Sequence, residues 1–490
     1  MGSVKPSSDE VEYGLDPENW DEFRALGHRM LEEMLTNLQT IGDRRTNFPT
    51  DEAIKSIRSP LKPEGDGEEA TYEVFKRDIL PYTFPHLGPH FWGVVAGTGS
   101  PYGMLTEMLA GGVNSCLETM FSEGYMHEQV IEWIKELLGY PKEAGGVLVG
   151  GGSEANFTGL AVARNAKAMV DAKAKGIQAL DRRMTLYTSE EAHHCLERSV
   201  ELLGLGNEAL RWIPTDDEYQ IKVDALKRAI REDRERNYHP FSIIGCAGTI
   251  NTGAFDDLQA LADVAAREDL WLHVEGAFGA WVKLSETHRH LVDGIERADS
   301  VAVDLHKWMS MPYGIGCTLV KDRFAHFSTF VYGHEAKYLK SGMGQVKDQL
   351  TNPHNLALPL SRNLSFKTYM LLRATGRDRF SRVIQQNLDQ TRQLAELIRK
   401  EPELEITAPV TSNIVCFRYR PEGLSEEELE KLNRAILKEI YGVSFWMISD
   451  ATLRGRYSLR ACNINHRTRA EDLSYLVGEV VKTGRRLMAG

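Results

Sequence analysis

The sequence predicts an α/β fold with a mainly parallel sheet flanked by helices, an N-terminal helical arm and a small C-terminal α+β domain. Two observations support this. Between residues 86 and 375, short apolar runs alternate with longer segments of helical periodicity. Such alternation is typical of strands that are buried on both faces and covered by helices. Residues 376–490 show a different order, with helix first, then strands, then a closing helix.

The elements follow in chain order. The arm, residues 1–85, has a helical pattern over residues 20–39 and then a charged connector. Because it shows no strand-rich core of its own, we expect it to pack on something else. The large domain, residues 86–375, has expected helices at 157–172 and 256–269 and expected strands at 147–149, 184–188, 241–246, 270–274, 300–304 and 315–320. In the small domain, residues 376–490, strands are expected at 413–419 and 457–462.

Composition narrows the class of protein. The chain has 490 residues, and its formal net charge of −12 argues against a general nucleic-acid surface. No 18-residue apolar span is present, and the first residues lack the apolar core of a signal peptide. The 6 cysteines are scattered without a CxxC motif, which is typical of free thiols in a reducing compartment. We therefore expect a cytoplasmic protein that binds neither nucleic acid nor membrane.

The loop after the strand at 147–149 is a candidate phosphate site. Open α/β sheets bind ligands beyond the carboxyl ends of their strands. Three glycines, the last being Gly152, allow close approach here, and Ser153 is a suitable N-cap for the helix that follows. Free N–H groups at a helix start favour an anion. An ordinary glycine-rich turn explains the same residues, since neither a Walker A nor a GxGxxG motif is present.

Polar residues also follow the next two strands. His193 and His194 come after the strand at 184–188, and because neighbours point in different directions, only one is expected to face a site. We expect His194 to lie on the surface. Thr249 lies in a small-residue turn after the strand at 241–246, which a plain strand-to-helix loop also explains.

The strand at 270–274 leads to an acid. His273 and Glu275 are two residues apart and therefore project from the same face. A carboxylate at the end of an apolar strand is costly unless it is paired. The pair is either part of a metal site or a carboxylate that faces a cationic ring nitrogen. No third ligand with a recognisable spacing is present, so no metal is predicted.

The strand at 300–304 is followed by Asp304, His306 and Lys307. Burial lowers the pKa of a lysine, and the neutral amine is a nucleophile toward carbonyls. The alternative is a lysine whose stem packs while its head reaches water. A phosphate cradle, a flat histidine ring, an acid and a lysine together match pyridoxal 5′-phosphate, whose aldehyde condenses with lysine and whose ring nitrogen needs a carboxylate.

These motifs resemble the group II pyridoxal-phosphate amino-acid decarboxylases of fold type I, and most closely the aromatic L-amino-acid and tyrosine decarboxylases. The resemblance spans nearly the whole chain, and the order of the motifs makes it specific. The matching segments are 23–28, 101–113, 152–156, 192–193, 248–249, 273–277, 304–308 and 458–468.

The resemblance implies a role for each matching residue. Lys307 would form the Schiff base, His193 would stack on the pyridine ring, and Ala277 would lie near its other face. The remaining matches concern the phosphate (Gly152, Ser153 and His306), support of the ring site (Thr249 and Asp304) and the ring nitrogen (Glu275, where the family has aspartate). Members of the family are homodimers with active sites at the subunit boundary, and the N-terminal arm wraps over the partner.

The implied activity is decarboxylation of an L-amino acid, with an aromatic substrate as the first expectation, to the amine and CO2. Family decarboxylases carry a loop tyrosine that donates a proton to Cα. Our alignment places Pro353 there with His354 next, and a histidine has a suitable pKa for an acid. In some relatives, loss of this tyrosine accompanies an oxygen-dependent reaction that gives an aldehyde, CO2 and ammonia.

Three alternatives therefore stay open. The first is an aldehyde synthase with the same cofactor, the second a metal-dependent hydrolase that uses His273 and Glu275, and the third a cofactor-free dimer. The substrate side chain is also open. Val95 falls near a position that is often aromatic in the family, and Phe91 and Trp92 either line the pocket or pack in a core.

Overall fold

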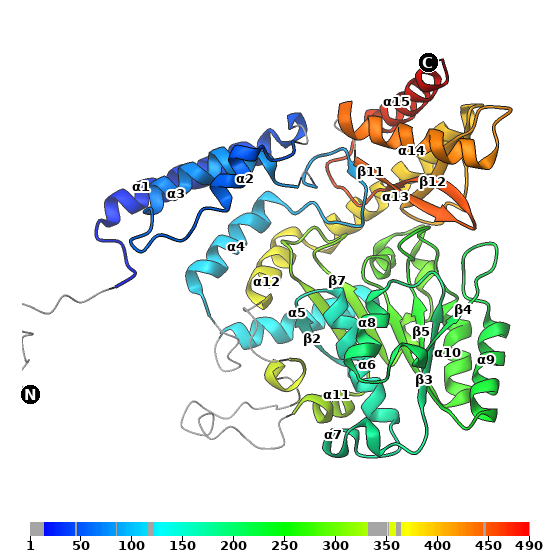
Figure 1. The fold of residues 1–490 in the computed structure, drawn as a ribbon. Coiled ribbons are helices and arrows are strands. Elements are labelled where there is room, and N and C mark those ends of the chain that lie inside the picture. Colours follow the sequence, from blue (N-terminus) through cyan, green and yellow to red (C-terminus); the bar gives the residue numbers. More distant parts are fainter. Residues whose placement is uncertain are drawn as a thin grey trace, which may run out of the picture. The chain divides into compact units, whose positions relative to one another are not determined.

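A computed structural model describes residues 14–44, 47–84, 86–115, 122–331, 350, 352–358, 364–443 and 447–489. The chain divides into two compact units, Met1–Pro85 and His86–Gly490 (Figure 1). The first consists of helices, and the second contains two sheets with their helices. In the described part of the chain, no helix is both long and apolar enough to cross a membrane.

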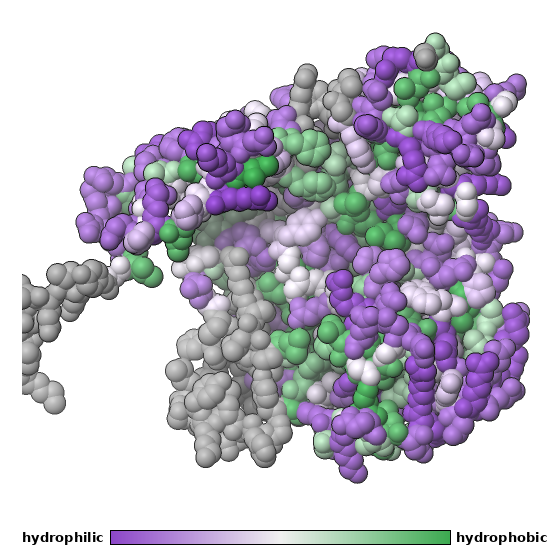
Figure 2. All heavy atoms as spheres, in the orientation of Figure 1, coloured by the Kyte–Doolittle hydropathy of each residue, from purple (hydrophilic) through white to green (hydrophobic). Residues whose placement is uncertain are grey.

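The N-terminal unit contains α1 (Trp20–Gln39), α2 (Asp51–Ile57) and α3 (Glu68–Val74). The helix predicted over residues 20–39 is confirmed as α1. It begins there because the Asn19 side chain accepts hydrogen bonds from two N–H groups of the first turn. Few of the unit's side chains are buried, and large apolar ones such as Trp20, Phe23 and Met30 are exposed. Figure 2 shows hydrophobic residues scattered among hydrophilic ones over these helices.

The large sheet has seven strands, in the order β2-β8-β7-β6-β5-β3-β4. Strand β8 is antiparallel to both of its neighbours, and the other adjacent pairs are parallel. The prediction of a mainly parallel sheet is therefore confirmed. The strands are β2 (Gly145–Val149), β8 (Gly316–Val320), β7 (Ser300–Asp304), β6 (Trp271–Glu275), β5 (His239–Cys246), β3 (Met184–Ser189) and β4 (Leu210–Ile213).

Six of these strands coincide with predicted ones, and β4 was not predicted. Its four residues include Arg211, and it lies at the edge of the sheet with two of its residues not buried. A short edge strand lacks the continuous apolar run by which a buried strand is recognised.

Helices cover both faces of the large sheet. Consecutive strand residues point to opposite sides, so a strand with a continuous apolar run has apolar side chains to bury on each face. Ile243 belongs to the same apolar cluster as residues of α5 (Ser122–Leu138), α9 (Val223–Glu235) and α10 (Leu258–Glu268). Ile244 belongs to a second cluster with residues of α6 (Gly152–Lys167) and α8 (Cys195–Leu202). The outer surface over α9 and α10 is strongly hydrophilic in Figure 2. The helix predicted at 256–269 corresponds to α10, whose first turn is capped by Asp257. The helix predicted at 157–172 begins five residues earlier and ends at Lys167.

The second sheet has the order β1-β11-β12-β10-β9. Its strands are β1 (Phe91–Trp92), β11 (Met447–Leu453), β12 (Arg456–Cys462), β10 (Ile414–Tyr419) and β9 (Leu404–Ile406). Three helices pack with it around a separate apolar core: α13 (Arg377–Lys400), α14 (Glu426–Val443) and α15 (Ala470–Ala489). The predicted α+β character is confirmed. The boundary at residue 375 stays a prediction, because residue contacts group His86–Gly490 into one unit.

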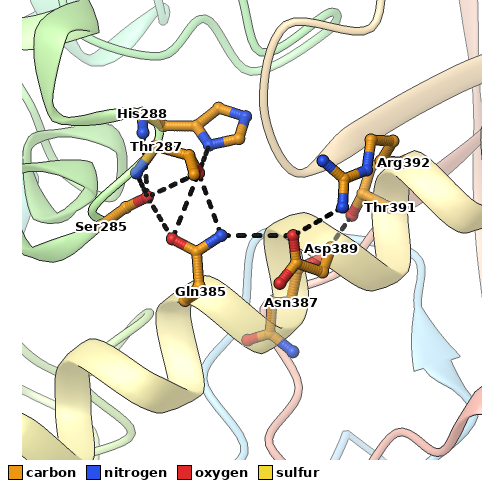
Figure 3. A network of polar contacts seen from close by, with 8 residues as sticks. All are labelled: Ser285, Thr287, His288, Gln385, Asn387, Asp389, Thr391 and Arg392. Carbon is orange, nitrogen blue, oxygen red and sulfur yellow. Dashed lines mark hydrogen bonds and ion pairs between the residues drawn. The ribbon is translucent and has the colours of Figure 1, made fainter.

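Polar contacts join α13 to the segment that follows the large sheet's strand β6 (Figure 3). The Ser285 hydroxyl donates to Gln385 Oε1 over 2.7 Å, and Gln385 Nε2 donates to Thr287 Oγ1 over 3.0 Å. Elsewhere on α13, Asn387 Oδ1 accepts a hydrogen bond from Trp308 Nε1 over 3.0 Å. The residue next to Lys307 is thereby held from outside the large sheet.

Candidate active site

A cavity of about 440 Å³ lies beyond the carboxyl ends of β2, β3, β5, β6 and β7. This is where ligands bind in open α/β sheets. The sequence analysis gave ten residues a role toward the cofactor or in catalysis. Eight of them line this cavity: Gly152, Ser153, His193, Glu275, Ala277, Asp304, His306 and Lys307.

The glycine turn between β2 and α6 is packed tightly against the cavity wall. A Cβ atom on Gly152 would lie 2.7 Å from Asp304 Oδ2, and one on Gly151 would lie 3.4 Å from His306 Cε1. Helix α6 begins at Gly152 with Gly151 as its N-cap, and no side chain caps it. The expectation that Ser153 is the N-cap is wrong, because the helix starts before it. The first N–H groups of α6 lack a side-chain partner at the N-cap, which suits an anion.

Lys307 reaches the cavity with a buried acid beside it. Its Nζ lies 3.1 Å from Asp304 Oδ2, and its side chain is 24% exposed against 2% for that of Asp304. Burial of an acid is costly unless the charge is paired, and Lys307 supplies the pairing. The other carboxylate oxygen, Oδ1, has no hydrogen-bond partner among the described residues. His306 Nδ1 lies 3.7 Å from it.

Two histidines line the cavity in neutral form. Burial lowers the pKa of His306, although Asp304 opposes this, and its Nδ1 lies 2.9 Å from the carbonyl oxygen of Ile315. Burial and the charge of Lys307 lower the pKa of His193, whose Nδ1 accepts a hydrogen bond from the N–H of Cys195 over 3.1 Å. The side chain of His194 is 90% exposed, as expected for a surface residue.

Glu275 and His273 leave the same face of β6 but have different surroundings. Glu275 Oε1 accepts a hydrogen bond from the N–H of Ala277 over 3.2 Å, and burial raises the pKa of this carboxyl while Lys307 lowers it. His273 is fully buried, with Nε2 2.8 Å from Asn156 Oδ1 and Nδ1 2.8 Å from Ser300 Oγ. Both ring nitrogens are therefore engaged, and burial lowers the pKa of His273 to about 3. His273 supports α6 and is not free to bind a metal.

Comparison with known proteins decides the family. The family model for the pyridoxal-dependent decarboxylase conserved domain matches residues 61–420. The chain belongs to this family. The aromatic-L-amino-acid decarboxylase of Bacillus atrophaeus is 30% identical over 468 residues, which cover 94% of this chain and 95% of the relative. The phenylacetaldehyde synthase of Arabidopsis thaliana is 26% identical over 464 residues, covering 91% and 92%.

Solved structures have the same fold. The crystal structure of Oryza sativa TDC with PLP and tryptamine has a TM-score of 0.87 at 22% identity, covering 97% of this chain and 100% of that one. Mouse CSAD has a TM-score of 0.84 at 25% identity, covering 94% and 99%. The predicted family, fold type and cofactor are confirmed. The protein is a pyridoxal-phosphate-dependent amino-acid carboxy-lyase.

The cavity fits this cofactor. A lysine amine reaches it, the uncapped start of α6 suits a phosphate, and a second buried carboxylate, that of Glu275, suits a cationic ring nitrogen. Among the residues that the structure describes, no group of three or more His, Cys, Asp or Glu side chains is arranged to hold a metal ion.

Thr249 is not among the residues that line the cavity, and the side chain of His354 is not described. The Thr249 hydroxyl lies 3.0 Å from Thr252 Oγ1 and accepts a hydrogen bond from the N–H of Ala254 over 3.1 Å, so it stabilises its own turn. Its neighbours Gly248 and Ile250 line the cavity instead. His354 falls in a short 3₁₀ helix, Pro353–Asn355, but its side chain lies outside the described residues.

Sequence reasoning missed Asn156, Cys195 and Phe278, all of which line the cavity. The sequence could have indicated Asn156, because it lies four residues after Gly152 and therefore on the same face of the helix. In the structure, its Nδ2 donates to the carbonyl oxygen of Gly152 over 2.8 Å. Trp92 was expected either to line the pocket or to pack in a core, and the second interpretation is correct. It is fully buried in the core of the second sheet, and its Nε1 donates to Thr468 Oγ1 over 2.8 Å.

Proposed function

We propose that this enzyme decarboxylates an aromatic L-amino acid to the amine and CO2. The observation that carries this proposal is the joining of Lys307 and the uncapped start of α6 in one cavity with an apolar wall of Val95, Ile250 and Phe278. An apolar wall favours a flat hydrophobic side chain because its burial removes apolar surface from water. Relatives from bacteria, plants and mammals that are named for aromatic substrates support the same substrate class.

The residues that would hold pyridoxal phosphate follow from their places in the cavity. Lys307 would bind the cofactor covalently. The start of α6, with Ser153 and His306, would hold the phosphate, and the imidazole ring of His193 would lie against the pyridine ring. When bound, the cofactor supplies an electron-withdrawing ring that takes up the electron pair left by CO2. Burial lowers the pKa of both histidines, so near pH 7 neither adds a positive charge beside the cofactor's phosphate.

Glu275 stands where an aspartate is expected from the resemblance, and its contact with Ala277 supports the same role for the longer side chain. One more methylene adds about 1.5 Å of reach. Glu275 Oε1 turns back to the N–H of Ala277 two residues later, which leaves Oε2 for the cofactor's ring nitrogen. A carboxylate there would hold a proton on that nitrogen. The substitution is thus compatible with decarboxylation.

A second reaction is favoured by one specific observation. Pro353 stands where our alignment expects the proton-donating tyrosine, and the Arabidopsis relative is named as an aldehyde synthase. Without an acid near Cα, an oxygen-dependent route to the aldehyde competes with release of the amine. We infer that His354 supplies the proton and that the amine is the main product.

Product analysis tests these two reactions. The enzyme with added cofactor is incubated with each aromatic L-amino acid, and CO2, amine, aldehyde and hydrogen peroxide are measured. Amine without peroxide is the expected result. Equal amounts of aldehyde and peroxide would replace the proposal with the aldehyde synthase. Release of CO2 from non-aromatic amino acids alone would contradict the substrate class.

We further propose a cytoplasmic homodimer with the N-terminal arm against the partner. Exposed Trp20, Phe23 and Met30 on α1 support this, because apolar side chains of this size are usually covered in an assembly. The free cysteines of the described chain, Cys195, Cys246, Cys317, Cys416 and Cys462, support a reducing compartment. Light scattering should give twice the chain mass, and a monomer of full activity would refute the dimer.

A further inference from the structure

The cavity holds two buried carboxylates, and only Glu275 has a chemical task in the function proposed above. Asp304 is the more buried of the two, at 1% exposure against 6%. It is also the acid within ion-pair distance of Lys307 Nζ, at 3.1 Å. Its Oδ1 is buried and accepts no hydrogen bond from the described residues, so this carboxylate keeps free lone pairs.

The position of Asp304 is fixed from three sides. Its backbone N–H donates to the carbonyl oxygen of Ala277 over 2.8 Å, and its own carbonyl oxygen accepts from Trp281 Nε1 over 2.8 Å. The carboxylate packs against the glycine turn, where even a methyl group on Gly152 would lie 2.7 Å from Oδ2. Asp304 therefore stays beside Nζ and cannot swing toward solvent.

Several titratable groups surround Lys307, and Asp304 is the carboxylate within ion-pair distance of its Nζ. The groups that interact electrostatically with Lys307 or Asp304 are Glu275 on β6, His193 and Cys195 around the start of α8, His306, Tyr313 and Cys462 on β12. Burial raises the pKa of the two thiols and of the phenol and lowers that of both histidines, so these groups are neutral near pH 7. Glu275 is the other carboxylate, and its Oε1 accepts a hydrogen bond from the N–H of Ala277. Asp304 is therefore the base in contact with Nζ, at 3.1 Å.

We propose that Asp304 moves the protons when Lys307 condenses with the cofactor's aldehyde. An ammonium has no lone pair and cannot attack a carbonyl, so a base must first take a proton from Nζ. Asp304 Oδ2 is within hydrogen-bond reach of that proton, as a general base must be. The unpartnered Oδ1 lets the same carboxylate hold a proton and return it without moving.

The step balances without a further reactant. The C–N bond forms as the carbonyl C–O bond breaks, and the oxygen leaves as water. Two of the three ammonium protons pass through Asp304 to that oxygen, and the third stays on the nitrogen. Nζ therefore begins and ends with a positive charge, and Asp304 begins and ends as its carboxylate partner. Because no proton is exchanged with solvent, the rate of condensation should be nearly independent of pH between 6 and 8.

The test uses the full-length protein freed of cofactor. Pyridoxal phosphate is added, without amino acid, and formation of the covalent adduct is followed by stopped-flow absorbance at several pH values. Asp304→Asn keeps the size of the side chain and removes the base. We expect its condensation to be about 10²- to 10⁴-fold slower at pH 7, which is the usual contribution of a general base. Its rate should rise about tenfold per pH unit, because hydroxide must then take the proton.

Glu275→Gln is the matched control, since it removes the other buried carboxylate of the cavity. Because Glu275 is proposed to face the ring nitrogen, this change should weaken cofactor binding, but the pH profile of condensation should stay flat since Asp304 is intact. A second variant, Asp304→Ala, opens space in which a small carboxylate from solution can replace the missing base. Its condensation rate should increase with formate concentration, while the rates of the unchanged chain and of Glu275→Gln should not. A purely structural role for Asp304 predicts no such rescue.

Each result decides the proposal. Native rates in Asp304→Asn, or a slow rate with a flat pH profile and no rescue of Asp304→Ala by formate, would overturn it. Unfolding temperatures measured alongside identify a variant that has lost its fold. The experiment also separates this proposal from the proposed substrate class. If the unchanged chain condenses with the cofactor but releases no CO2 from aromatic amino acids, the substrate class fails and the role of Asp304 still stands.

Discussion

Replacing Gly152 by alanine should loosen the cofactor site through a single steric conflict. The new Cβ atom would lie 2.7 Å from Asp304 Oδ2 and 3.2 Å from its Cγ, where ordinary contacts begin at 3.4 Å. The carboxylate or the start of α6 must therefore move by about 0.7 Å, the difference between 3.4 and 2.7 Å. Since Asp304 is held by its backbone on both sides, neither shift is free.

Overpacking of this kind costs about 1–3 kcal/mol. A change of about 1.4 kcal/mol corresponds to a tenfold change in an equilibrium constant. If the whole cost falls on the conformation that binds the cofactor, the Kd for pyridoxal phosphate rises about 5- to 150-fold. Equilibrium titration with pyridoxal phosphate, followed by absorbance, measures this change. Thermal unfolding of the cofactor-free protein shows how much of the cost falls on the fold instead.

Gly478→Ala is the control. Gly478 lies inside α15 in the same unit, and a Cβ atom there would meet nothing within 4 Å. Because alanine is a better helix former than glycine, this change should leave cofactor binding unaltered and stabilise the protein by up to about 1 kcal/mol. Native cofactor affinity and native stability in Gly152→Ala would refute the steric argument, and with it the fixed position of Asp304.

Three further predictions follow from the site. Lys307→Ala should abolish the visible absorption band of the cofactor-loaded protein and its bleaching by borohydride, and persistence of both would exclude Lys307 as the anchor. His354→Ala should shift the products from amine toward aldehyde and peroxide, because the proposed acid is lost, and an unchanged product ratio in the oxygen-electrode and amine assays would dismiss its role. His273→Leu should lower the free energy of unfolding by roughly 2–5 kcal/mol in a denaturant titration, because Asn156 Oδ1 and Ser300 Oγ each lose a buried partner; a metal analysis identical to that of the unchanged chain is expected.

Much of the large domain could be predicted because its signals are local. A strand buried on both faces needs only its own apolar run to be recognised, and β7 therefore has the predicted bounds of Ser300–Asp304. Strand β4 and the antiparallel direction of β8 were not predictable in this way. Direction depends on the neighbouring strand, and an edge strand lacks the apolar run.

The errors at the site arise from contacts between distant residues. Ser153 has the right residue type for an N-cap, but the helix starts before it, at Gly152, with Gly151 as the N-cap. Asp304, 152 positions further along the chain, packs against Gly152, and this contact is not visible in the local sequence. His273 was a reasonable partner for Glu275 on one strand face. Only the packing of α6 against β6 and β7 shows that Asn156 and Ser300 occupy both of its nitrogens.

The sequence by itself determined which chemical groups this protein has at the ends of its strands, and through the order of its motifs which family and cofactor they belong to. This is possible because strand ends and glycine turns are written in neighbouring residues. Only the tertiary structure decided how those groups pair. Lys307 is paired with Asp304, and Glu275 accepts a hydrogen bond from the N–H of Ala277. A buried charge needs a polar partner, and the packing of the chain determines which group lies beside it.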